Sequence, residues 1–140
     1  MKRKVNCVLL VDDDEVANYI HKFIIKEADF AEHILVVENG QKALNHLKSN
    51  NTNARIRPNL IFLDINMPGM DGWEFLEQFN LLDEALKDEV KVVMLTTSLN
   101  PDDRVQAEAN RNIDHFISKH LTVELLHELR LQYLANEFKK

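Results

Sequence analysis

The chain has 140 residues, 45% of them hydrophobic, and a formal net charge of −6 at pH 7, which suits one domain with an apolar core and argues against a general nucleic-acid binder. No apolar run reaches the roughly 18 residues of a membrane span, and the basic residues 1–4 lead through a short apolar stretch into three aspartates, unlike a signal peptide. Cys7 is the single cysteine and cannot form an internal disulfide, so we expect a cytoplasmic protein that binds neither DNA nor a membrane.

Five short apolar runs alternate with five helix-like segments along the chain. The runs predict strands at residues 5–11, 34–37, 60–63, 92–95 and 113–117. The first run has no polar alternation beyond Asn6, which is typical of a strand covered on both faces. The most polar stretch, residues 49–58, predicts an exposed loop within the domain.

The helical segments are predicted from apolar residues spaced to face a core. The first helix follows residues 12–14, and its expected inward stripe is Val16, Ile20, Phe23 and Ile24, ending at the polar Glu27. The second is expected to bury Ala43, Leu44 and Leu47, and the third, from about Gly72, carries Trp73, Leu76, Phe79, Leu82 and Leu86. The fourth has Asn100 as N-cap and Pro101 at its first position, with a thin stripe of Val105 and Ala109. The last begins near Thr122 and carries Leu125, Leu126, Leu129, Tyr133 and Leu134.

This alternation predicts an α/β fold: a doubly wound (βα)5 domain with a five-stranded parallel sheet and helices on both faces. In such folds, ligands bind at the carboxyl ends of the strands. The polar groups that follow the strands are Asp12 and Asp13, Asp64, Thr96 and Lys119, so all of them fall on one edge. The end of the second strand, residues 38–40, offers much less.

The residues at this edge have the chemistry needed for phosphoryl transfer. Neighbouring carboxylates repel one another unless a divalent cation lies among them, and Mg²⁺ prefers carboxylates, water and phosphate oxygens. Lys119 adds a point charge suited to phosphate, and Thr96 adds a hydroxyl donor. Together these residues indicate phosphoryl transfer onto Asp64, with an acyl phosphate as the product.

Four sequence elements, in this order and spacing, resemble the receiver domain of two-component response regulators. They are residues 12–13 (DD), 63–72 (LDINMPGMDG), 95–97 (LTT) and Lys119. The resemblance covers essentially the whole chain, and it implies the flavodoxin-like, CheY-like strand order 2-1-3-4-5. We therefore expect residues 1–140 to form a single receiver domain with no effector domain.

The resemblance also implies a role for each site residue. Asp64 is the expected phosphoacceptor, and the expected Mg²⁺ (or Mn²⁺) ligands are Asp13 directly, Asp12 mainly through water, Asp64 itself and the backbone carbonyl of Asn66. The expected phosphate-binding and switch groups are the Thr96 hydroxyl, the Thr97 backbone N–H, Lys119 and the aromatic ring of Phe116. Asn66 and Ser98 occupy the two positions that tune dephosphorylation.

Partners and output follow from the same resemblance. The expected phosphodonor is a sensor histidine kinase or a histidine phosphotransfer protein, and the output is a change in partner binding rather than catalysis of another reaction. A homodimer through the fourth helix, fifth strand and last helix is possible in this family. The run of residues 95–98 and the polar loop before Pro58 look most like the stand-alone receivers found with phytochrome-type kinases.

Some features leave alternatives open. Lys119-His120 replaces the usual Lys-Pro, which leaves open whether this bond is cis or trans. A dehalogenase-like phosphatase needs a second aspartate where this chain has Asn66, and a receiver-like scaffold that is never phosphorylated remains a third interpretation. The six histidines show no metal-ligand spacing and are expected to be mostly solvated, with His120 the one that could titrate near neutrality.

Overall fold

One parallel sheet forms the centre of the molecule. The structure is a computed structural model and describes residues 4–48, 57–96, 100–117 and 120–135. The five strands are β1 (Val5–Val11), β2 (Ala31–Val37), β3 (Leu60–Leu63), β4 (Lys91–Leu95) and β5 (His115–Ile117), in the order β2-β1-β3-β4-β5. The predicted doubly wound, flavodoxin-like fold is confirmed. The predicted residues Thr97, Ser98 and Lys119 lie outside the described residues.

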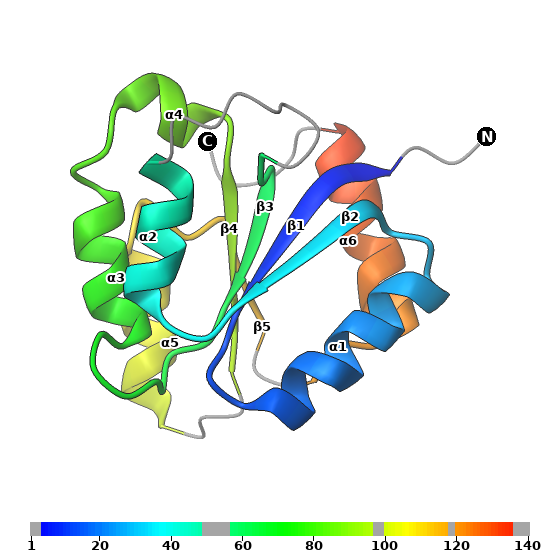
Figure 1. Ribbon diagram of the computed structural model, residues 1–140, viewed down its shortest axis with the longest axis horizontal. Coiled ribbons are helices and arrows are strands. Elements are labelled where there is room, and N and C mark those ends of the chain that lie inside the picture. Colours follow the sequence, from blue (N-terminus) through cyan, green and yellow to red (C-terminus); the bar gives the residue numbers. More distant parts are fainter. Residues whose placement is uncertain (1–3, 49–56, 97–99, 118–119, 136–140) are drawn as a thin grey trace.

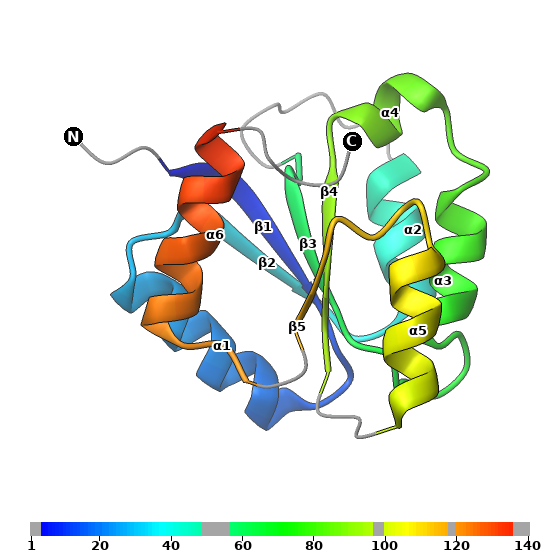
Figure 2. The same ribbon diagram turned by 180° about the vertical axis from the view of Figure 1, so that it is seen from behind.

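Helices cover both faces of this sheet. They are α1 (Glu15–Glu27), α2 (Gly40–Lys48), α3 (Gly72–Phe79), α4 (Glu84–Asp88), α5 (Pro101–Ala109) and α6 (Val123–Ala135). α1 and α6 lie on one face, and α2, α3 and α5 lie on the other (Figures 1 and 2). Among the described helices, none has the length and apolar character needed to cross a bilayer.

The interior strand β1 has helices over both of its faces. It pairs in parallel with β2 on one side and with β3 on the other. Alternate side chains point to opposite faces of a strand, so Leu9 and Val11 join the core under α2 and α3, whereas Val8 and Leu10 join the core under α1 and α6. This double burial explains the nearly unbroken apolar run of β1.

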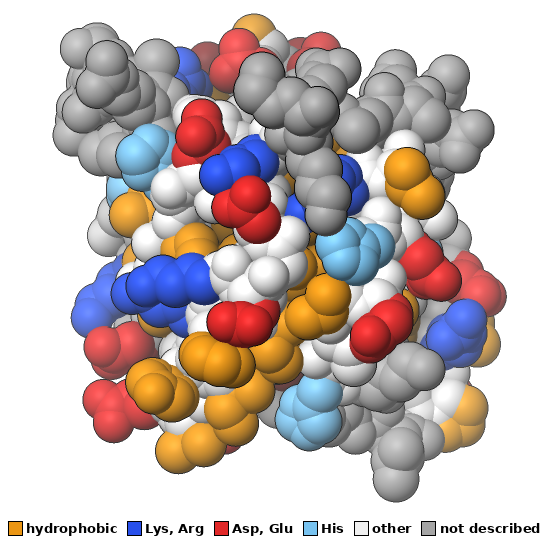
Figure 3. Space-filling model, turned by 90° about the vertical axis from the view of Figure 1, so that its right-hand side faces the viewer, with side chains coloured by type: hydrophobic (Ala, Val, Ile, Leu, Met, Phe, Trp, Pro, Cys, Tyr) orange, Lys and Arg blue, Asp and Glu red, His pale blue; other side chains and the backbone are white. Residues whose placement is uncertain are grey.

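The predicted inward stripe of α1 is wrong apart from Ile24, which packs against the core. Val16 is 66% exposed and Phe23 is 57% exposed, whereas the buried residues of the helix are Asn18, His21 and Ile25. The Asn18 amide Nδ2 donates to the Asp12 carbonyl at 2.9 Å, which turns this side of α1 toward the sheet. Hydrophobic side chains therefore gather on the outer surface of α1, at the lower left of Figure 3.

The third predicted helix is interrupted. α3 ends at Phe79, and a short separate helix, α4, carries Leu86. Leu82 and Leu86 still pack against the core as expected, while Leu81 between the helices is 76% exposed. The apolar positions were predicted correctly, but the turn between them was not.

α5 begins as predicted and faces the sheet differently. Asn100 caps the helix by accepting from the Asp102 backbone N–H at 3.0 Å, and Pro101 follows at the first position. Val105 and Ala109 were expected to face inward, but both are exposed, and Ala107 is the buried residue. A helix with few apolar residues gives no clear stripe, so its orientation depends on how it fits the sheet.

Candidate functional site

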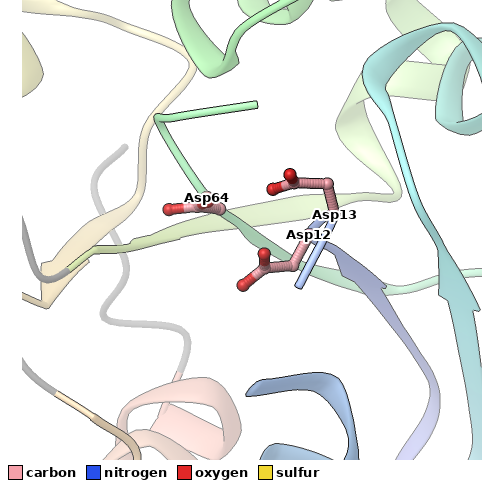
Figure 4. A group of neighbouring side chains, drawn as sticks. All are labelled: Asp12, Asp13 and Asp64. Atoms are coloured by element: carbon pink, nitrogen blue, oxygen red, sulfur yellow. The ribbon is translucent and has the colours of Figure 1, made fainter. Parts of the chain in front are cut away.

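Three carboxylates meet where β1 and β3 end. Asp12 and Asp13 follow β1, and Asp64 follows β3. One carboxylate oxygen from each residue lies within 4.8 Å of the others, and the three side chains project to the same side of the strand ends (Figure 4). Val11 and Leu63 are register partners in the parallel pair, so the residues that follow them emerge side by side. The predicted acidic cluster is therefore formed by the topology of the sheet.

These carboxylates line an open pocket of about 390 Å³. The residues around it are Asp12, Asp13, Asp14, Ala17, His21, Asp64, Asn66, Leu95, Thr96 and His120. Three converging carboxylates are hard oxygen donors, the ligand type that Mg²⁺ and Mn²⁺ prefer. The pocket leaves room for waters and a phosphate group beside such an ion. The donor set therefore fits a hydrated divalent cation.

Burial and mutual repulsion shape the electrostatics of the cluster. Burial, with a further contribution from the Asp12 charge, raises the pKa of Asp64 from 3.8 to about 7, although hydrogen bonds from the Ile65 and Asn66 backbone oppose the shift. Burial also raises the pKa of Asp12. A cation among these groups favours their ionised forms and would lower both pKa values. The cluster is thus poised to bind a cation.

The backbone beside Asp64 is held in place by a close approach of α3. The Gly72 N–H donates to the Ile65 carbonyl at 2.8 Å, and a Cβ at Gly72 would lie 2.5 Å from the Asp64 carbonyl oxygen. Asp71 and Glu74 form a reciprocal capping box, with bonds of 2.8 and 3.0 Å, that fixes the start of α3. A residue without a side chain at position 72 therefore allows the start of α3 to contact the Asp64–Ile65 backbone.

The aspartates after β1 have different local roles. Asp14 is the N-cap of α1 and accepts from the Val16 and Ala17 backbone N–H groups at 2.9 and 3.3 Å. Asp12 accepts from the Asp14 N–H at 3.0 Å through Oδ1, so one of its oxygens is already engaged. Asp13 is exposed at the rim of the pocket.

Of the other predicted residues that the structure describes, Asn66 follows β3, Thr96 follows β4 and Phe116 lies on β5. Thr96 is 3% exposed, lines the pocket and donates its backbone N–H to the Ile117 carbonyl at 3.0 Å. Asn66 is exposed and also lines the pocket. Phe116 is half-buried on β5, and the Arg104 guanidinium lies 5.6 Å from the centre of its ring. Asp12, Asp13, Asp64, Asn66 and Thr96 are therefore together, and Phe116 is one strand away.

One pocket residue, His21, was missed from the sequence. His21 was expected to be solvated, but it is 5% exposed and lines the pocket, and its ring centroid lies 6.1 Å from that of His120. A usable signal was the helical spacing of Asn18, His21 and Ile25, which matches one face of a helix. The neighbouring stripe of Val16, Ile20 and Phe23 is more apolar, so it was predicted to face the core instead.

Comparisons with known proteins agree with this geometry. The family model described as the response regulator receiver domain matches residues 8–130. A two-component response regulator from Cytophaga hutchinsonii is 37% identical, with a TM-score of 0.85 over 95% of this chain and 99% of that one. The probable methanogenesis regulatory protein FilR2 of Methanothrix harundinacea is 30% identical and covers 84% of this chain and 74% of its own length. The phosphorylated cyanobacterial phytochrome response regulator RcpA is 26% identical, with a TM-score of 0.71 over 94% of each chain.

Proposed function

The chain belongs to the response regulator receiver family, which acts in two-component phosphorelay signalling, and on this premise we propose that Asp64 accepts the phosphoryl group. The observation that carries the proposal is the convergence of Asp64 with two further carboxylates, within 4.8 Å, in a pocket large enough for a phosphate. The end of a buried strand gives Asp64 a rigid support, and its half-burial leaves the carboxylate open to attack an incoming phosphorus atom.

The metal is held, in this proposal, by Asp13, Asp64 and the backbone carbonyl of Asn66, with Asp12 acting mainly through water. The bond from the Asp14 N–H to Asp12 supports the indirect role of Asp12. Members of the family generally bind Mg²⁺ through acidic residues, and Mn²⁺ suits the same donors. The cation supplies charge neutralisation between the carboxylates and the oxygens of the phosphoryl group.

The transfer step needs an ionised Asp64. A carboxylate oxygen of Asp64 forms the new bond to phosphorus as the phosphorus–nitrogen bond of a phosphohistidine breaks, and the departing imidazole keeps the electron pair of that bond. The donor is a sensor histidine kinase or a histidine phosphotransfer protein, and the compartment is the cytoplasm. Because burial raises the pKa of Asp64 to about 7, the ionised fraction depends on the cation being bound.

Phosphorylation then changes the surface near β4 and β5. The Thr96 hydroxyl, the Thr97 N–H and Lys119 bind the phosphoryl oxygens, and movement of Phe116 carries the change to the surface. Arg104 contacts the Phe116 ring, so a rotation of that ring alters the outer side of α5. Asn66 and Ser98 set how fast water removes the group. The α5–β5–α6 surface is the proposed site of any homodimer.

The outer surface of α1 is the proposed docking face for the phosphodonor protein. Val16, Tyr19, Ile20 and Phe23 are between 44% and 74% exposed, an unusual group of large apolar side chains for a surface helix. Ala17, on the same helix, lines the pocket. A donor that brings a histidine to Asp64 must cover the adjacent surface. Burial of these four apolar side chains by the donor would contribute favourable free energy to the complex.

A hydrolytic enzyme is the competing function, and Asn66 argues against it. Dehalogenase-like phosphatases need a general acid–base aspartate two residues after the nucleophile, and an exposed amide cannot supply a proton in that way. We therefore propose that the chain catalyses only its own phosphorylation and dephosphorylation. Turnover of a phosphomonoester beyond one equivalent per chain would contradict this.

Incubation with a small phosphodonor and Mg²⁺, followed by intact-mass measurement, tests the acceptor. Wild type should gain one phosphoryl group, Asp64→Asn should gain none, and the exposed Asp88→Asn should behave as wild type. Chelation of Mg²⁺ should abolish the adduct. An Asp64→Asn protein that is labelled as efficiently as wild type, or a wild type with no Mg²⁺-dependent adduct, would overturn the proposal.

A further inference from the structure

Two histidines from distant parts of the chain meet at the same pocket. His21 comes from the middle of α1, and His120 lies directly before Leu121 and the start of α6. Their ring centroids are 6.1 Å apart and the ring planes are tilted by 44°. Both residues line the pocket that contains the carboxylate cluster. The fold therefore brings two imidazole rings into a pocket lined by carboxylates.

The state of His21 suits a metal ligand. Its side chain is 5% exposed, and its Nε2 atom is buried and makes no hydrogen bond to any residue that the structure describes. Burial, with a further contribution from His120, lowers the pKa of His21, so the ring is neutral at physiological pH. A buried nitrogen left without a hydrogen-bond partner is unfavourable. A ligand that occupies a nitrogen of this ring would offset part of that cost.

The two rings lie close to the separation that coordination of one ion requires. A Zn²⁺–nitrogen bond is about 2.0–2.1 Å long, so two imidazoles bound to one tetrahedral ion have ring centroids roughly 5–5.5 Å apart. The centroids of His21 and His120 are 6.1 Å apart, so a small movement of one ring would bring both nitrogens onto one ion. His120 is exposed, so its side chain can rotate to improve the angle without disturbing the core.

We propose that His21 and His120 form a second metal site, which binds a borderline divalent cation such as Zn²⁺ beside the carboxylate cluster. Imidazole nitrogen suits Zn²⁺, whereas the carboxylates suit Mg²⁺, so the two sites differ in ligand type. Asp14 also lines the pocket, and its negative charge favours a cation next to His21. Water molecules complete the coordination shell.

Bound Zn²⁺ has two consequences. It ties α1 to the start of α6, two helices that lie on the same face of the sheet. It also places a cation and its waters within the pocket that an incoming phosphodonor must enter, so Zn²⁺ lowers the rate of phosphorylation. The binding of Zn²⁺ does not rest on the proposed function, whereas this loss of rate does.

Competition for Zn²⁺ against a chromophoric chelator tests the site. In excess Mg²⁺, which occupies the carboxylate cluster, wild type should bind one equivalent of Zn²⁺. His120→Gln should bind about tenfold more weakly or worse, because one of two imidazole ligands is lost. His21→Gln should show the same loss. If this substitution of a buried residue unfolds the protein, the substitution of the exposed His120 still tests the site. The matched control is His33→Gln on the exposed edge of β2, which should bind as wild type does. A further increase of Mg²⁺ should leave the Zn²⁺ affinity of wild type unchanged.

Two results would overturn the proposal. His120→Gln with wild-type affinity shows that the ion does not use this imidazole, and displacement of Zn²⁺ by Mg²⁺ places the ion at the carboxylates. A phosphorylation assay with Zn²⁺ then separates this inference from the proposed function. Inhibition should be strong in wild type and weak in His120→Gln, whereas a wild type that is never phosphorylated contradicts only the function of Asp64.

Discussion

The substitution Asp64→Asn should stabilise the metal-free protein at pH 8. In the folded chain, burial and the Asp12 carboxylate raise the pKa of Asp64 from 3.8 to about 7. At pH 8 the folded protein must therefore ionise a group that resists ionisation, while the unfolded chain ionises it freely. Asparagine has nearly the same shape as a protonated carboxyl group and carries no charge, so the substitution removes this cost.

The size of the effect follows from the pKa shift. The difference between 3.8 and about 7 corresponds to about 4 kcal/mol at 1.36 kcal/mol per unit. Asp64 is only half-buried, and solvent in the open pocket screens part of the repulsion, so we expect a gain of about 2 kcal/mol. For a chain of this length, that gain should raise the thermal midpoint by roughly 5–10 °C.

The pH dependence has a definite sign. A carboxyl group with a raised pKa binds a proton more tightly in the folded state, so wild type loses stability as pH rises from about 4 to about 7. Asp64→Asn lacks this titration. The difference between the two proteins should therefore be small near pH 4 and reach its full size above pH 7.

Urea denaturation in EDTA, at a series of pH values from 4 to 8, measures this difference. Asp88→Asn removes an exposed carboxylate and should stay within about 0.5 kcal/mol of wild type. Equal stabilities of wild type and Asp64→Asn at pH 8 would refute the repulsion argument. So would a stabilisation that keeps its size at pH 4, because it could not come from ionisation.

The remaining predictions concern packing and the metal. Arg130→Met should cost about 2 kcal/mol in urea denaturation, because two carbonyl oxygens at the end of α1 lose a buried donor at 2.6 and 3.0 Å, while the exposed Leu131→Ala should cost far less. Gly72→Ala should cost about 1–3 kcal/mol and slow phosphorylation, because the new Cβ would lie 2.5 Å from the backbone oxygen of the acceptor residue. Gly40→Ala meets a flexible methionine side chain and should cost less, and equal losses would contradict this reasoning. Mg²⁺ at a hundredfold excess over its dissociation constant should stabilise wild type by about 2.7 kcal/mol, and Asp13→Asn should show much less stabilisation at the same concentration.

The strands and the carboxylate cluster could be predicted because their signals are local. Each strand is a short apolar run, and β1 and β3 each end in an aspartate. The rotation of α1 could not be predicted in the same way. Val16, Ile20 and Phe23 have the spacing of a buried stripe, but the bond from Asn18 to the Asp12 carbonyl turns a different face inward. A polar contact of this kind leaves no trace in hydrophobic periodicity.

The sequence by itself determined the order of the elements and the edge of the sheet at which Asp12, Asp13, Asp64 and Thr96 meet. The physical reason is that parallel strands joined by helices send all their carboxyl ends to one side. Only the tertiary structure decided which side of each helix is covered and that His21 faces His120. Those outcomes depend on how α1 and α6 pack beside each other on the sheet, and neither segment contains the information alone.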